Sequence, residues 1–198
     1  MKIILEKEIK EKKMKAGTIG LMGLIIVIFL AGGCGTVPQT PEARAVLSAQ
    51  VKETVTIMKK RDPSIETFFQ KSYGYAVLPK VFKGAFWIGG ANGKGEVYER
   101  RSMVGYCSMT QASLGFSFGG EFFREIIFFR DKEDLDRFKT EEYVFAAQVM
   151  GVALTSGAAA KADYKSGTAV FIMSDKGLMI DASFGGQKFN YVPTSLIK

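Results

Sequence analysis

The feature that most limits what this chain can fold into is a run without charged residues, from Ala16 to Gly33. A basic segment precedes this run, its centre from Ile19 to Leu30 is apolar, and small residues lead into Cys34. A basic flank, a short apolar centre and small residues before a cleavage point are typical of a secretory signal. The pattern predicts that residues 1–33 are removed and that the folded protein is built from the 165 residues that begin at Cys34.

The residues around Cys34 resemble the lipobox of bacterial lipoproteins, with Leu30 four positions before the cysteine rather than the more common three. The resemblance implies that the Cys34 thiol receives diacylglycerol, that the bond after Gly33 is cut, and that the new amino terminus is acylated. Two or more acyl chains hold a protein firmly to a bilayer. Because Gly35 rather than Asp follows the cysteine, we expect a lipid anchor in the outer membrane of the cell envelope, facing the periplasm.

The alternative interpretation of the same stretch is an uncleaved transmembrane anchor. Residues 16–31 are shorter than the roughly 20 apolar residues that a spanning helix needs. No basic stop-transfer cluster follows, since the first charge after Cys34 is Glu42. These flanks favour the cleaved lipoprotein. The segment from Met1 to Lys13 is long and mixed in charge for a signal, so translation could also start at Met14.

Composition excludes several classes of function. Residues 34–198 carry a net charge of +4, which suits anionic lipid headgroups and is too weak to indicate nucleic acid binding. The chain has no His, which removes His-based catalysis and His-ligated metals. Beside a lipidated Cys34, Cys107 is left without a disulfide partner and is expected to be a small buried apolar residue. We therefore expect a protein that is not an enzyme and has no cofactor or metal.

Helical signals fill the start of the mature chain, after a short tether at residues 34–41. Thr40-Pro41 is a helix start, and an amphipathic stripe from Leu47 to Met58 leads to the basic end 59–61. Asp62-Pro63 repeats the cap-plus-proline signal and predicts a second short helix that ends near residue 72. Such a stripe is more typical of a core-facing surface than of a membrane-inserting one.

Strand signals with a period of two follow from Tyr75 onward. The expected strands are 75–78, 85–88, 96–99, 103–106, 114–118, 126–129, 169–173 and 178–182. Pro79 indicates an edge strand or a bend. The Gly-rich run 89–95 predicts a hairpin turn around Asn92-Gly93, and Arg100-Arg101 is expected to close another hairpin. The last two strands, with a turn at 174–177, form a predicted hairpin, and 126–129 is a strand covered on both sides. Asp131 begins a short helix, and strand is favoured within 144–160. Strands with helices at one end define an α+β domain.

Five segments, in order along the chain, resemble the SYLF domain family. They are Tyr75-Ala76-Val77-Leu78-Pro79-Lys80, the glycines after Trp87, Gln111-Ala112-Ser113-Leu114-Gly115, Phe128-Phe129 before the capped helix, and Lys176-Gly177-Leu178-Met179. The match extends from about Val46 to Val192, so that residues 42–198 form one SYLF-like domain. Cys107 and the bulky pair Phe122-Phe123 depart from many relatives. The expected fold is an antiparallel, strongly curved or barrel-like sheet with N-terminal amphipathic helices and one short internal helix.

The resemblance implies binding of phospholipids, with phosphoinositides and actin filaments as ligands of some eukaryotic relatives. Lipid binding in the family has been associated with the N-terminal helix and a basic surface. The matching residues of this chain, and so the candidate headgroup ligands, are Lys59, Lys60, Arg61, Lys80 and Lys83. The basic charge beside a lipid anchor supports the same expectation, a membrane-tethered protein that binds anionic phospholipid. The alternative is an envelope scaffold that binds a protein partner, and an enzyme acting on lipids is the third interpretation.

Overall fold

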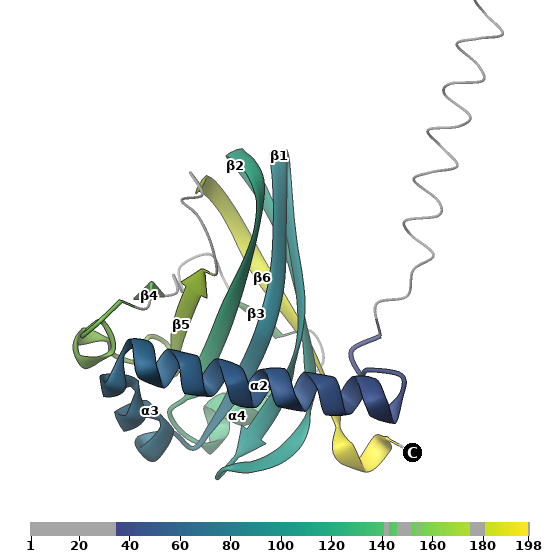
Figure 1. Cartoon of the computed structure of the whole chain (residues 1–198), viewed down its shortest axis with the longest axis vertical. Coiled ribbons are helices and arrows are strands. Elements are labelled where there is room, and N and C mark those ends of the chain that lie inside the picture. The colour runs from purple at the N-terminus through teal and green to yellow at the C-terminus, as the bar shows by residue number, and fades with distance from the viewer. Residues whose placement is uncertain (1–34, 141–142, 146–151, 154, 175–180, 198) are drawn as a thin grey trace, which may run out of the picture. The chain divides into compact units, whose positions relative to one another are not determined.

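The computed structural model describes residues 35–140, 143–145, 152–153, 155–174 and 181–197 (Figure 1). The chain divides into two units, Met1–Gly35 and Thr36–Lys198. Cys34 and the predicted signal lie outside the described residues. Two hydrophobic clusters formed by described residues lie within Thr36–Lys198. This second unit therefore carries its own core, and we expect it to fold without residues 1–35.

The helices at the start of this unit are those that the sequence predicts. Helix α2 (Pro41–Arg61) begins after Thr40, whose Oγ1 accepts a hydrogen bond from the Ala43 amide at 3.1 Å. Asp62 then caps the 3-10 helix η1 (Pro63–Ile65), which continues into α3 (Glu66–Lys71). The cap-plus-proline signals are local, so the sequence around each of them was sufficient to predict both helix starts.

Two long antiparallel strands, β1 (Gly74–Glu99) and β2 (Ser102–Phe129), form the centre of the sheet. Arg100 and Arg101, with φ of 47° and 71°, make the two-residue turn between them, as predicted. Pro79 does not interrupt the strand as predicted, because β1 continues through it. The described pairing places β1 at an edge of the sheet, one of the two positions expected for Pro79, and the register with β2 shifts between Leu78 and Val81.

The hairpin turn predicted at Asn92-Gly93 is wrong, because residues 89–95 continue β1. The glycines serve close packing instead. A Cβ on Gly95 would lie 2.2 Å from the carbonyl oxygen of Val77, and one on Gly93 would lie 2.7 Å from Cγ2 of Val81. The second half of β1 thus packs directly against the backbone of its first half, which only residues without a side chain permit.

The remaining elements complete the sheet and add one helix. Helix α4 (Lys132–Lys139) begins after Asp131, which accepts a hydrogen bond from the Asp134 amide at 3.0 Å, as predicted. The other elements are β3 (Tyr143–Phe145), β4 (Val152–Ala153), η2 (Ala159–Lys161), β5 (Thr168–Ser174), β6 (Asp181–Pro193) and η3 (Thr194–Leu196). Within 144–160, where strand is favoured by the sequence, the described residues include two short strands and part of η2, while 146–151 and 154 lie outside them.

The predicted C-terminal hairpin is also wrong in its pairing. Both β5 and β6 pair with the same edge of β2, β5 along Phe123–Phe129 and β6 along Gly105–Ser117. The two strands follow one another along that edge, and the described residues show no pairing between them. β2 is long enough to pair with both strands at once. Residues 175–180, which include most of the predicted turn, lie outside the description.

The sheet has the order β3-β6-β2-β5-β4, with β1 on the other edge of β2 (Figure 1). It is antiparallel except for the β4–β5 pair, strongly curved and not closed. Alternate residues of β2 serve two clusters: Ile127 and Phe129 join α4, while Ile126 and Phe128 join α2 and α3. The predicted α+β class and the strand covered on both faces are confirmed.

Candidate functional site

The apolar stripe of α2 belongs to the core. Leu47, Val51 and Met58 are 7%, 2% and 0% exposed and pack in the cluster beneath the helix. The stripe is therefore not available for insertion into a bilayer, which confirms the core-facing interpretation. Any contact between the described surface and lipid has to use other residues.

The basic end of α2 is partly neutralised by its surroundings. Lys59 Nζ lies 2.8 Å from Glu66 Oε2 and 4.4 Å from the centre of the Phe69 ring. Its hydrogen bond to Glu66 is the main reason that the pKa of that carboxyl is lowered. Lys60 and Arg61 are exposed. Of the three predicted ligands at this end, two thus present their charge to solvent.

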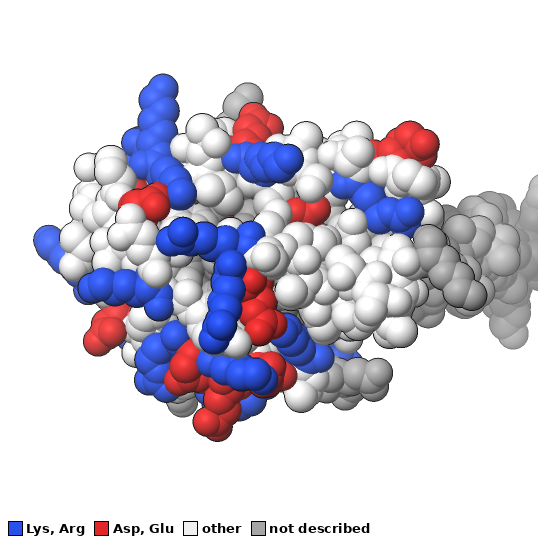
Figure 2. Space-filling model, turned by 90° about the horizontal axis from the view of Figure 1, so that it is seen from below, with Lys and Arg blue, Asp and Glu red and all other residues white. Residues whose placement is uncertain are grey.

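The surface seen from below mixes both signs of charge (Figure 2). Basic side chains stand beside acidic ones rather than forming a continuous positive area. The ion pairs of α4 illustrate this, with Arg130 and Arg137 both against Asp134, and Lys139 against Glu99. Paired surface charges of this kind offer little net attraction to an anionic partner.

Lys80 and Lys83 lie on opposite faces of β1. Lys80 is exposed, with Nζ 4.5 Å from the centre of the Phe122 ring on β2. Lys83 is only 8% exposed and shares the strand face of Val81, which lies in the α4 cluster. The structure therefore does not place Lys83 where a headgroup ligand would be, and Lys80 is the accessible member of the pair.

A groove of about 430 Å³ lies between the first half of α2 and β1. Two lysines, Lys80 and the half-buried Lys94, contribute positive charge to it. The other lining residues are Pro38, Gln39, Ala43, Val46, Leu47, Gln50, Pro79, Asn92 and Gly93. No carboxylate is among these lining residues, so the groove is a cationic concavity lined by apolar and neutral polar residues. Sequence reasoning missed Lys94 because it placed residues 89–95 in a turn.

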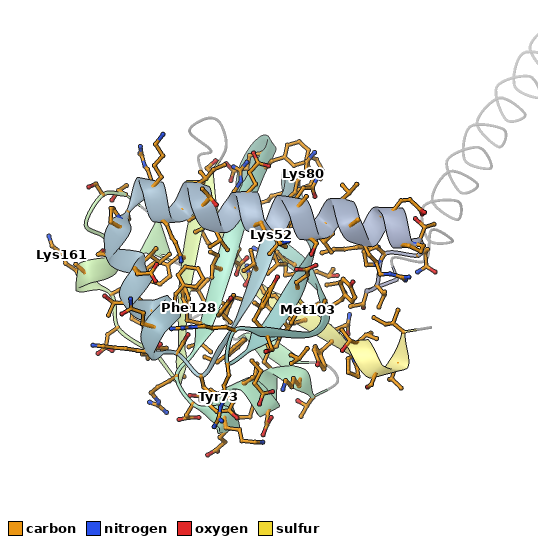
Figure 3. All side chains as sticks on the ribbon, turned by 60° about the horizontal axis from the view of Figure 1, so that its bottom comes forward. Lys52, Tyr73, Lys80, Met103, Phe128 and Lys161 are labelled. Atoms are coloured by element: carbon orange, nitrogen blue, oxygen red, sulfur yellow. The ribbon has the colours of Figure 1, made fainter. Side chains whose placement is uncertain are left out.

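The groove and the basic end of α2 are separate places on the domain. Lys80 lies beside residues 43–50 of the helix, and Lys59 is nine residues further along than Gln50. At 1.5 Å per residue this is about 14 Å along the axis. Figure 3 shows Lys80 beside α2 and Tyr73 at the far end of the sheet. The five predicted ligands are thus not one site.

A pair of exposed aromatic rings extends the groove. Phe82 on β1 and Phe122 on β2 are direct cross-strand partners with ring centres 5.2 Å apart. They remain 45% and 40% exposed. Their neighbours on the same strand face, Gly84 and Gly120, have no side chains to cover them, and the Phe82 ring lies against both. Lys80 connects the groove to this pair through its contact with Phe122.

The chain enters the domain beside the groove. The hydroxyls of Thr36 and Ser108 are hydrogen-bonded at 3.0 Å, and Val37 packs against the α2 cluster. Pro38 is buried and lines the groove. The predicted tether of residues 34–41 is therefore in contact with the domain from Thr36 onward. Cys34 itself is outside the described residues, so its role stays a prediction.

The described residues include neither a candidate metal-binding cluster nor a candidate membrane-spanning helix. No group of three or more Cys, Asp and Glu residues in that part of the chain could hold a metal ion. No helix in the described ranges has the length and apolar character to cross a bilayer. Cys107 is fully buried, as predicted, and burial raises the pKa of its thiol.

Comparison with known proteins shows a similarity to a bacterial protein. The chain is 30% identical over 149 residues to Beta cell expansion factor A of Aeromonas veronii, a SYLF-domain protein. The aligned part is 75% of this chain and 57% of the relative, so the chain spans little more than half of that protein's length. No protein-family model matches the chain. The similarity agrees with the SYLF resemblance of the motifs.

Proposed function

We propose that this protein is a lipid-anchored, non-enzymatic component of the bacterial cell envelope whose domain binds anionic phospholipid. The lipobox-like sequence at Cys34 supports the anchor, and the similarity to a SYLF-domain protein fits a lipid-binding or scaffold role in general. The observation that carries the choice of lipid is the groove in which Lys80 and Lys94 stand without a carboxylate.

Two basic residues at a membrane surface attract anionic headgroups by about 1 kcal/mol each. Lys80 and Lys94 keep this attraction because no acid among the lining residues offsets it, whereas Lys59 is bound to Glu66. The acyl anchor would keep the domain at the bilayer, so that even weak headgroup binding becomes effectively intramolecular. The relevant ligand is therefore a phosphate-bearing headgroup in the same membrane as the anchor.

Charge reversal tests this proposal. In co-sedimentation with vesicles that contain anionic phospholipid, the Lys80→Glu/Lys94→Glu variant of Thr36–Lys198 should bind at least about 30-fold more weakly than the wild type, because two attractive charges become repulsive. The matched control is Lys60→Glu/Arg61→Glu, which makes the same change in net charge at the other end of α2 and should have a smaller effect. An equal loss of affinity in both variants would contradict the proposal, because binding would then depend only on the net charge of the domain and not on the groove.

The anchor has a separate test. Cells that express the full chain should incorporate labelled palmitate into the protein, and the Cys34→Ser variant should lose the label and remain a larger precursor. Cys107→Ser is the control, because that thiol is buried within the domain. Retention of label by Cys34→Ser would contradict the lipoprotein assignment. In the binding experiments, a domain that binds an envelope protein and no lipid would support the scaffold alternative.

A further inference from the structure

Exposed large apolar side chains are rare in the described part of this chain, and most of them are in one place. Among the residues whose side chains the structure describes, which leave out 85–89, 112–119 and 181–185 among others, they are Val46, Phe82, Phe122 and Leu196. Val46 lines the groove together with Lys80, Phe122 carries the Lys80 ammonium over its ring, and Phe82 packs on Phe122. Three of the four thus surround a single lysine, while Leu196 lies in η3.

We propose that the Phe82–Phe122 pair enters the headgroup layer of the bilayer, with Lys80 and Lys94 beside it at the phosphates, so that this face of β1 and β2 is the one that contacts the membrane. The inference rests on the proposed function. It adds which face of the domain contacts the membrane and that its aromatic rings reach the headgroup layer. Aromatic rings next to basic side chains are the combination that interfacial regions of bilayers favour, since the ring sits among glycerol and headgroup atoms while the ammonium meets phosphate.

The local structure explains why the rings can reach outward. Gly84 and Gly120 are cross-strand partners immediately beyond the pair, and no side chain rises from them. A Cβ on Gly84 would lie 3.3 Å from the Phe82 ring, so the ring rests on bare backbone on that side. The ring also packs on Phe122 and still keeps 45% of its surface exposed. Packing over glycine fixes the orientation of the ring and leaves its outer surface for a partner.

The position of the chain entry favours a membrane as that partner. Pro38 lines the groove, and Cys34 precedes it by four residues in the sequence. Four residues span at most about 14 Å when fully extended. An acylated Cys34 would therefore keep the bilayer surface close to the groove and to the aromatic pair that borders it. A soluble protein partner would have no comparable reason to meet this face.

A depth-sensitive fluorophore gives the direct test. A Phe122→Cys variant of Thr36–Lys198 can be labelled with NBD at one position, because the remaining thiol, Cys107, is fully buried. With anionic vesicles, we expect a blue shift of NBD emission and quenching by a nitroxide on the upper part of the lipid acyl chain. Lys161→Cys is the control, since Lys161 is exposed and lies far from Lys80 in Figure 3, and its label should stay in water.

A second measurement leaves position 122 unlabelled. The Phe82→Ser/Phe122→Ser variant should bind anionic vesicles about tenfold more weakly, because apolar burial in the interface is lost, while its binding should still fade with salt. The control is Phe82→Leu/Phe122→Leu, which keeps apolar side chains at both positions. It should retain most of the binding and would show that the fold tolerates substitution there. Far-UV circular dichroism of each variant monitors folding.

The outcomes separate the two proposals. Wild-type binding to anionic vesicles with an unshifted NBD label at position 122 and unchanged affinity of the serine variant would overturn the aromatic contact and leave lipid binding standing. Absence of wild-type binding at every lipid composition would overturn both. A shifted label at position 122 together with an unshifted label at position 161 is the result that the geometry predicts.

Discussion

Glu125 provides a quantitative prediction about stability. It is completely buried on β2, and its Oε2 accepts a hydrogen bond from Gln187 Nε2 at 3.3 Å. Its other carboxyl oxygen has no hydrogen-bond partner in the described part of the protein. Burial raises the pKa of Glu125 from 4.5 to about 8, since a charge there would lose its hydration. The folded protein therefore holds this proton at neutral pH, and the unfolded chain does not.

A carboxyl whose pKa is raised on folding makes its full contribution to stability below pH 4.5, its unfolded value, and that contribution is lost as the pH rises toward about 8. Each pH unit in this window removes about 1.4 kcal/mol. At pH 7 the folded protein has thus lost about 3 kcal/mol of its stability relative to acidic solution. Glu125→Gln removes the titration and keeps an oxygen that accepts from Gln187, so it should be more stable than the wild type by roughly that amount near neutrality.

Urea unfolding of Thr36–Lys198 at several pH values measures the effect. The chain has no His, so few other groups titrate in this window. The wild type should lose stability between about pH 5 and about pH 8, and the curve of Glu125→Gln should be nearly flat there. Parallel curves for the two proteins would refute the reasoning, because they would show that Glu125 is not the group that titrates.

Two further predictions follow from packing. Gly95→Ala should lower the free energy of unfolding in urea by at least about 3 kcal/mol, because its Cβ would lie 2.2 Å from the Val77 carbonyl oxygen. The control is Gly90→Ala, whose Cβ would have its nearest contact at 3.5 Å and which should cost less than about 1 kcal/mol. Equal costs would contradict the close approach within β1. Asp62 Oδ2 accepts a hydrogen bond from the Ala159 amide at 2.8 Å. Asp62→Ala should therefore destabilise the domain by about 2 kcal/mol and speed hydrogen exchange at the Ala159 amide. Unchanged exchange at this amide would contradict the role of Asp62.

Local signals in the sequence were sufficient for the helices and for placing most of the predicted strand segments in strands. The number of strands was predicted wrongly, because 75–78, 85–88 and 96–99 are parts of β1, and 103–106, 114–118 and 126–129 are parts of β2. Thr40-Pro41 and Asp62-Pro63 act through hydrogen bonds within a few residues, so their effect does not depend on the rest of the fold. Arg100-Arg101 likewise needs only its two flanking strands. The α+β class and the two-sided burial of residues 126–129 followed from the same periodicity.

Long-range contacts explain what the sequence could not predict. Asn92-Gly93 is a common turn sequence, and only the packing of β1 on itself makes it a strand. The C-terminal strands have the composition of a hairpin, but both pair with the same edge of β2. Lys83 and Lys80 look equivalent in the sequence, but the irregular register between Leu78 and Val81 and the alternation beyond it bury one and expose the other.

The most direct test of the central claim is equilibrium binding of wild-type Thr36–Lys198, without acyl chains, to vesicles of neutral and of anionic phospholipid. We predict binding that requires anionic lipid and weakens from low to moderate salt, as screening shortens the reach of Lys80 and Lys94. Absence of binding to either kind of vesicle at low salt would contradict the claim, because Cys34 would then be the protein's sole link to the membrane.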